Sequence, residues 1–320
     1  MKIAVFVPSR PHFGNILTQL PFLCALKEEY PNATIDIWSK FQQSKLLLTV
    51  NAADSLINYK KFSFIKLISE LNAQQYDVAY NLYSGSDKVH IAIGLSKIKE
   101  TFGHSNNKLH KFCYQKHLKV HKGFQYIANS HLALLNTIRS RHYTPNIIKS
   151  LVNTNTQKES MGLTLLPGGG AGDYKRWALK HYLITAEQIA LQHPELSVIN
   201  WVLGPDEKHY EESIPNKIAN IPTQIHHTPT VSDLIELALS SKLSIANDCG
   251  PTHIFQMLTV PLITLWGWKN SKASPYNTMS EWFYSYEHSW AITPNEEDKC
   301  INAITTNKVT TLALAQLNRK

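Results

Sequence analysis

The fold is decided by Leu243-Ser244-Ile245-Ala246-Asn247-Asp248-Cys249-Gly250-Pro251-Thr252-His253. Residues 243–246 predict a short buried strand, and the four residues after them predict a tight turn. Pro251 suits the first position of a helix, because a proline there gives up no intrahelical hydrogen bond. The free amides of Thr252 and His253 would then point outward with the positive end of the helix dipole. The stretch therefore predicts an open α/β sheet with an anion-binding turn after one strand, or an ordinary turn that Asp248 caps.

Short apolar runs and helical patterns alternate on both sides of this stretch. Strands are expected at 3–7, 34–38, 78–82, 162–166, 196–203, 243–246 and 260–266. Helices are expected at 41–50, 126–139, 179–192, 206–217, 230–241, 251–258 and 308–317. Such alternation indicates parallel sheets with crossover helices, and so an α/β fold class.

The polar segment from Ser150 to Ser160 is the best linker candidate. It predicts two α/β domains, at 1–155 and 156–300, and a C-terminal helix at 301–320 that packs back on the first domain. The basic stretch from Gly103 to Phe124 shows no clear period and is expected to be a loop or an irregular insertion.

Composition limits the class of protein. The chain has 320 residues, of which 43% are hydrophobic and 18% charged, and this composition excludes a disordered protein. Thirty-two Lys and Arg against 24 Asp and Glu give a net charge of +8, which suits a phosphorylated ligand, an anionic membrane surface or nucleic acid.

The four cysteines lie far apart, so neither a disulfide scaffold nor a zinc knuckle is expected. Pro8 and Arg10 interrupt the first apolar run, and no run of ~18 apolar residues exists, so a cytoplasmic location is expected.

Two further loops follow strands in the second half of the chain. Four glycines lie between Gly168 and Gly172 and allow close backbone approach to a ligand, and Lys175 and Arg176 follow them. Asp173 occupies the last glycine position of G-x-G-x-x-G, so this is not a dinucleotide fingerprint, and it lacks the G-K-[ST] of a Walker loop. The third loop, 203–207, carries carboxylates that could accept hydrogen bonds from a ribose. Each loop alone also fits a surface turn, but three after three strands of one half predict a diphosphate cradle.

Together these segments resemble glycosyltransferase family 9, the heptosyltransferases of the bacterial lipopolysaccharide core. The family has a GD-type turn near the N-terminus, a glycine-containing loop ending in K-x-W or K-R-W, and a D-T-G-x-x-H loop. Here they are Gly14-Asn15, the loop ending in Lys175-Arg176-Trp177, and 248–253. The resemblance implies a GT-B fold, with two Rossmann-like domains whose parallel sheets face each other across a cleft. It also implies an inverting, metal-independent transfer from a nucleotide-activated sugar, with no cofactor.

The resemblance further implies which residues bind the donor. Lys175 and the turn at 250–253 would hold the pyrophosphate, Glu207 would hold the ribose, and Asp248 would anchor its loop or approach the donor. Lys175 and Arg176 would stabilise the charge that grows on the departing nucleoside diphosphate. The implied donor-binding residues are Gly168, Gly169, Gly170, Lys175, Arg176, Glu207, Asp248, Cys249, Gly250, Pro251, Thr252 and His253.

The sequence departs from the family pattern at two positions. Cys249 stands where the family usually has threonine, which replaces a good hydroxyl donor by a weak thiol. Asn15 stands where the family has its general base, and a neutral amide cannot take a proton from an acceptor hydroxyl. His12 is the expected substitute, ahead of Asp173 and Asp87, because an imidazole accepts a proton near neutral pH. A catalytically inactive nucleotide-sugar-binding or scaffold protein is the alternative.

The first domain is expected to receive the acceptor. The candidate acceptor-binding residues are Ser9, Arg10, His12, Asn15, Asp87 and Lys88. The basic segment from Lys108 to Lys122 could meet anionic sugars, lipid phosphates or the membrane face, or it is a solvated loop. By resemblance, the expected partners are an ADP-heptose-like donor, a lipid A-core acceptor and the inner membrane surface. A two-domain solute-binding protein is not expected, because it would need a signal peptide and the N-terminal sequence does not resemble one. Nucleic-acid binding is not expected either, because no recognition motif supports it.

Overall fold

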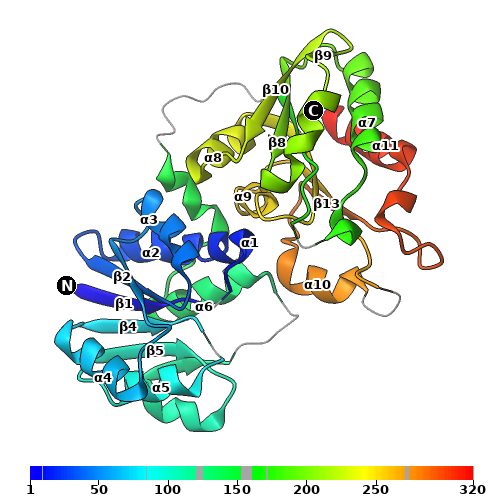
Figure 1. Cartoon of the computed structure of the whole chain (residues 1–320). Helices are drawn as coiled ribbons and strands as arrows, with labels where there is room; N and C mark the ends of the chain where they lie inside the picture. The colour runs from blue at the N-terminus through cyan, green and yellow to red at the C-terminus, as the bar shows by residue number, and fades with distance from the viewer. Residues whose placement is uncertain are drawn as a thin grey trace. The chain divides into compact units, whose positions relative to one another are not determined.

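The computed structural model of the chain describes residues 1–8, 10–83, 85–119, 125–152, 161–170, 172–270 and 274–319. The chain forms two compact units, Met1–Leu151 and Val152–Lys320 (Figure 1). Each unit is built on a mostly parallel β-sheet with helices packed on it, so the predicted α/β fold class is confirmed. Among the described residues, every helix is too short or too polar to span a bilayer.

The first unit contains a six-stranded sheet in the order β3-β2-β1-β4-β5-β6, and every neighbouring pair is parallel. Its strands are β1 (Lys2–Phe6), β2 (Thr34–Ser39), β3 (Ser55–Asn58), β4 (Val78–Asn81), β5 (Glu100–His104) and β6 (Lys116–Leu118). The strand order reverses between β1 and β4. Because open α/β sheets bind ligands beside such a reversal, the loops that follow Phe6 and Asn81 form the expected binding edge of this unit.

The helices of the first unit connect these strands. They are α1 (Phe13–Leu17), α2 (Leu20–Glu29), α3 (Leu46–Thr49), α4 (Phe64–Ala73), α5 (Asp87–Gly94) and α6 (Ile127–Arg139). Pro21 stands in the first turn of α2, where it removes no helical hydrogen bond, so it is compatible with an unbroken helix. Of the two alternatives for 103–124, the plain loop is wrong for the described part, which contains the end of β5, the 3₁₀ helix η2 (Lys108–Cys113) and β6. These elements are too short to produce a visible period.

His104 on β5 and His131 on α6 are among the buried histidines of the first unit. Burial lowers the pKa of His104 to about 4, and burial together with repulsion from His104 lowers the pKa of His131 to about 3.

Because of these two histidines, we expect the folded protein to lose stability in acid. In the unfolded chain each has a pKa near its ordinary value of about 6.5. Below that pH the unfolded chain binds protons that the folded chain does not, so the free energy of unfolding falls by about 1.4 kcal/mol per pH unit for each histidine. The loss should continue down to the folded pKa values. Denaturant unfolding at pH 7, 6 and 5 measures it, and His131→Leu should reduce the slope by about one proton. If the free energy of unfolding of the variant had the same pH dependence as that of the parent, His131 would not cause the acid sensitivity.

The second unit contains a seven-stranded sheet in the order β13-β12-β11-β7-β8-β10-β9, parallel except for the β9–β10 pair. Its strands are β7 (Gly162–Leu166), β8 (Val198–Leu203), β9 (Lys217–Ile218), β10 (Ile221–His227), β11 (Ser241–Asn247), β12 (Leu262–Leu265) and β13 (Ser289–Ile292). The order reverses between β7 and β11, so the loops after these two strands lie at the expected ligand position of this unit.

The helices of the second unit are α7 (Leu179–Gln192), α8 (Val231–Leu239), α9 (Thr252–Met257), α10 (Pro275–Trp282) and α11 (Thr306–Leu317). Thr230 and Asp233 form a capping box at the start of α8. The predicted helix at 206–217 is instead a 3₁₀ helix, η5 (Pro205–Ser213), because its polar sequence offers no apolar stripe for an α-helix to bury. Helix α11 packs on α7 and contributes Val309 to the core of this unit. Its packing on the first unit stays a prediction.

Candidate functional site

The loops after β7 and β11 are tied together by one buried side chain, that of Asn247 at the end of β11. Its Nδ2 donates to the carbonyl of Pro167, 2.7 Å away. Its Oδ1 accepts from the Tyr182 hydroxyl at 2.9 Å and from the Trp177 amide at 3.4 Å. No local pattern in the sequence singles out Asn247, because its three partners lie 65 to 80 residues away along the chain.

Replacing Asn247 by the similarly sized leucine should therefore destabilise the second unit. A carbonyl, an amide and a hydroxyl would lose their buried partner, so we expect the free energy of unfolding to fall by about 2–4 kcal/mol. Urea unfolding measures this loss. Asn318→Leu, at the exposed C-cap of α11, is a suitable control because it leaves these bonds intact. Equal stability of the two variants would show that Asn247 does not hold the loops.

The same two loops also share an ion pair between Lys175 Nζ and Asp248. Asp248 is buried, and burial raises the pKa of its carboxyl while Lys175 opposes the rise. The side chain of Lys175 is 18% exposed. The structure thus places a nearly buried ammonium group at the reversal point of the sheet, where an anionic ligand could share it with Asp248.

The loop after β8 joins this group through Glu207, whose side chain is 5% exposed. Glu207 Oε1 accepts from the Gly169 amide at 3.3 Å and lies 3.4 Å from Arg176 Nε. A Cβ at Gly204 would lie 2.8 Å from Glu207 Oε2, so a larger residue there would press on the carboxylate. Arg176 also pairs with Asp173 at 2.9 Å. One polar cluster therefore connects the ends of β7, β8 and β11.

The remaining predicted donor residues lie beside this cluster. A Cβ at Gly170 would meet no atom within 4 Å, so this part of the loop borders open space. Helix α9 begins at Thr252, one residue later than expected, and the Thr252 hydroxyl donates to the carbonyl of Asn247 at 2.9 Å. Burial raises the pKa of the Cys249 thiol to about 11 and lowers that of His253 to about 3, so both side chains are neutral at pH 7. Gly250 and Pro251 form the half-buried turn between them.

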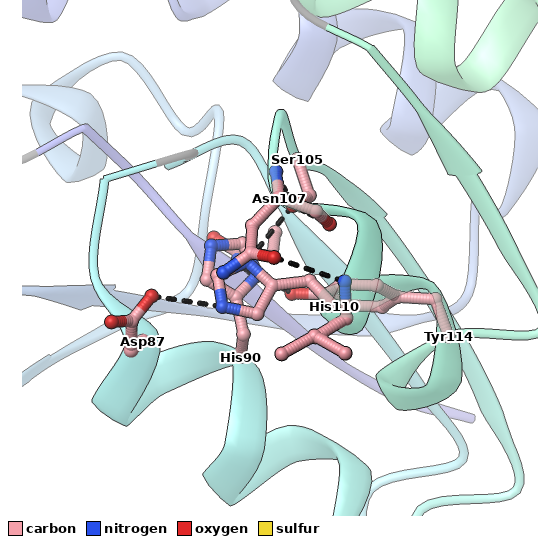
Figure 2. A network of polar contacts seen from close by, with 8 residues as sticks. Asp87, His90, Ser105, Asn107, His110 and Tyr114 are labelled. Atoms are coloured by element: carbon pink, nitrogen blue, oxygen red, sulfur yellow. Dashed lines mark hydrogen bonds and ion pairs between the residues drawn. The ribbon is translucent and has the colours of Figure 1, made fainter.

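The first unit has its own polar network at its binding edge, after β4 and β5 (Figure 2). His110 on η2 is buried, with Nε2 2.9 Å from Asp87 Oδ1 and Nδ1 2.9 Å from Ser105 Oγ. The His110 ring stacks on His90 at a centroid distance of 3.9 Å. His90 Nδ1 in turn lies 2.6 Å from the hydroxyl of Tyr114.

This network fixes the position of one carboxylate. Asp87 stands in the first turn of α5 and its side chain is 76% exposed, while the histidine that holds it is 6% exposed. Both His110 contacts are satisfied when Nε2–H donates to Asp87 and Nδ1 accepts from the Ser105 hydroxyl. Asp87 could be predicted from the sequence, but the network could not, because its members come from separate segments of the chain.

The other predicted acceptor residues do not take part in this polar network as far as the structure describes them. Arg10 is exposed, and His12 is exposed at the N-cap position of α1, where its side chain makes no capping hydrogen bond. The backbone carbonyl of Asn15 accepts hydrogen bonds from the side chains of Thr18 and Gln19, which lie between α1 and α2. Lys88 donates to the carbonyl of Phe62. Ser9 lies outside the described residues.

Comparisons with known proteins identify relatives over most of the chain. The model of glycosyltransferase family 9 (heptosyltransferase) matches residues 64–303. Lipooligosaccharide heptosyltransferase 2 of Campylobacter jejuni is 22% identical over 302 residues, which cover 86% of this chain and 84% of that protein.

Two solved structures are similar over nearly the whole chain. A family 9 glycosyltransferase from Veillonella parvula has a TM-score of 0.67 and 17% identity, covering 99% of this chain and 97% of that one. The E. coli heptosyltransferase WaaC with ADP has a TM-score of 0.69 and 16% identity, covering 99% and 100%. At these identities the two structures support the fold.

Proposed function

The chain belongs to glycosyltransferase family 9, and on that premise we propose that it transfers heptose from ADP-heptose to a lipopolysaccharide core-type acceptor. The proposed reaction inverts the anomeric carbon and needs neither a metal ion nor a cofactor. It would take place at the cytoplasmic face of the inner membrane, where the lipid-linked acceptor is exposed. The relatives support the donor, since WaaC has been solved with ADP and with an ADP-heptose analogue.

The convergence of Lys175, Glu207 and the glycine loop carries this proposal. When the bond between the anomeric carbon and the diphosphate breaks, the leaving ADP gains negative charge. Lys175, whose side chain is 18% exposed, would stabilise this charge, and such contacts act strongly where water is excluded. The backbone of the glycine loop can approach the phosphates closely because no side chains intervene.

Glu207 is suited to hold the ribose of the donor. Its Oε1 is occupied by Gly169 and Arg176, while Oε2 lies beside Gly168 and Gly204. Because these glycines have no side chains, a ribose diol could reach Oε2 and donate hydrogen bonds to it. Arg176 also forms ion pairs with two aspartates, Asp173 and Asp206. It is therefore fixed in position and would keep the Glu207 carboxylate in place.

The function is tested by incubating the protein with ADP-heptose and a heptose-deficient core acceptor. We expect release of ADP that depends on the acceptor, a product of inverted anomeric configuration by NMR, and an equal rate with EDTA present. Binding of ADP-heptose without acceptor-dependent release would favour the alternative, an inactive nucleotide-sugar-binding protein. Asn15 at the family's base position is the observation behind that alternative.

A further inference from the structure

The 3₁₀ helix η2 has three different faces. Residues three apart in a 3₁₀ helix lie one above the other. His110 is buried and Cys113 half-buried, so these two form the inner face. Leu109 and Phe112 form an outer face and are 70% and 77% exposed. Lys108 and Lys111 form the third face, which is also exposed.

Helix α5 extends this surface. A Cβ at Gly94 would lie 2.9 Å from the Cα of Cys113, so the end of α5 rests directly on η2. Beside Gly94, Ile91 and Leu95 are 42% and 61% exposed. The name α5–η2 surface is used below for Ile91, Leu95, Lys108, Leu109, Lys111 and Phe112. Four large apolar side chains are thus exposed on or beside two packed elements, and globular proteins rarely expose large apolar patches without a partner.

The charge of the first unit is strongly positive. Residues 1–151 contain 19 of the 32 Lys and Arg but only 8 of the 24 Asp and Glu, a net charge of +11. Residues 152–320 have 13 basic and 16 acidic residues, a net charge of −3. The basic excess of the whole chain thus belongs to the unit that carries the α5–η2 surface.

We propose that the α5–η2 surface docks the enzyme on an anionic lipid bilayer. Leu109 and Phe112 enter the headgroup region, and Lys108 and Lys111 contact lipid phosphates, as in other interfacial amphipathic segments. The phosphates of a nucleic acid could pair with the two lysines, but a nucleic acid would leave the exposed leucine and phenylalanine without an apolar partner. A second copy would bring two positively charged units together, which their repulsion opposes.

Docking through η2 would also serve the proposed function, and the inference rests on that function. The inner face of η2 holds Asp87 through His110, while its outer face carries the apolar pair. A bilayer bound to the outer face would therefore bring the binding edge of the first unit to the membrane, where a lipid-linked acceptor lies.

Vesicle sedimentation tests the proposal. The full chain is mixed with POPC vesicles or with POPC:POPG (70:30) vesicles, at 150 and 500 mM NaCl. We expect binding to the anionic vesicles that weakens several-fold at high salt. The double variant Leu109→Ser/Phe112→Ser should bind about tenfold more weakly or worse. Leu191→Ser is the matched control, because Leu191 is 68% exposed on α7 of the second unit, and it should bind like the parent.

Two results would overturn the proposal: equal vesicle binding by the double variant and the control, or no binding of the parent to anionic vesicles. Loss of duplex RNA binding in the double variant, with vesicle binding retained, would also overturn it. Activity with a delipidated core oligosaccharide separates the two hypotheses. If the parent turns over this acceptor but does not bind vesicles, the docking inference fails alone. If it binds vesicles through Leu109 and Phe112 but releases no ADP, the proposed function fails alone.

Discussion

Replacing Lys175 by alanine should lower kcat by about 10²–10³-fold, because the variant lacks the ammonium group that stabilises the departing diphosphate. The structure adds a second effect that an exposed lysine would not have. Without Lys175, the buried carboxylate of Asp248 loses its partner, so we expect the free energy of unfolding to fall by about 1–3 kcal/mol. Steady-state ADP release and urea unfolding measure the two effects.

The double variant Lys175→Ala/Asp248→Asn separates these effects. It leaves no unpaired buried charge, so its stability should recover while its kcat stays low. Lys180→Ala, an exposed position on the neighbouring helix α7, is the matched control and should behave as the parent. If the double variant regains both stability and rate, Lys175 supports the fold and has no part in the transfer.

Replacing His12 by alanine should lower kcat by about 10²–10⁴-fold, the usual contribution of a general base. His12 is exposed at the start of α1, on the edge of the first sheet where its strand order reverses, and its side chain makes no capping bond. Because the ADP-binding residues proposed above lie in the second unit, ADP affinity should change less than about twofold. Isothermal titration with ADP and kcat over a range of pH measure the two quantities.

His142→Ala is the matched control, since His142 is also exposed in the first unit. Asp87→Asn tests the competing base, which His110 already holds in place at 2.9 Å. A large loss in Asp87→Asn together with retained activity in His12→Ala would transfer the role of base to Asp87. Loss of the acidic limb of the pH–rate profile should accompany whichever substitution removes the base.

Local patterns predicted most regular elements of the fold. Helix α7 begins and ends where its apolar period predicts, and the capping pair of α8 is visible as Thr230 and Asp233. Strands β6 and β13 were not predicted, because three or four residues of mixed polarity carry no period. The pair His226-His227 ends β10, whose pairing with β8 is decided by residues far away in the chain.

The sequence by itself determined the fold class and the three loops of the candidate donor site, because glycines, prolines and apolar periods act on their immediate neighbours. Only the tertiary structure decided which groups meet. It paired Lys175 with Asp248, made Asn247 the link between two loops, and held Asp87 with His110. The physical reason is that hydrogen bonds and ion pairs act over about 3 Å in space, regardless of distance along the chain. Such partners become neighbours only when the strands of a sheet have taken their order.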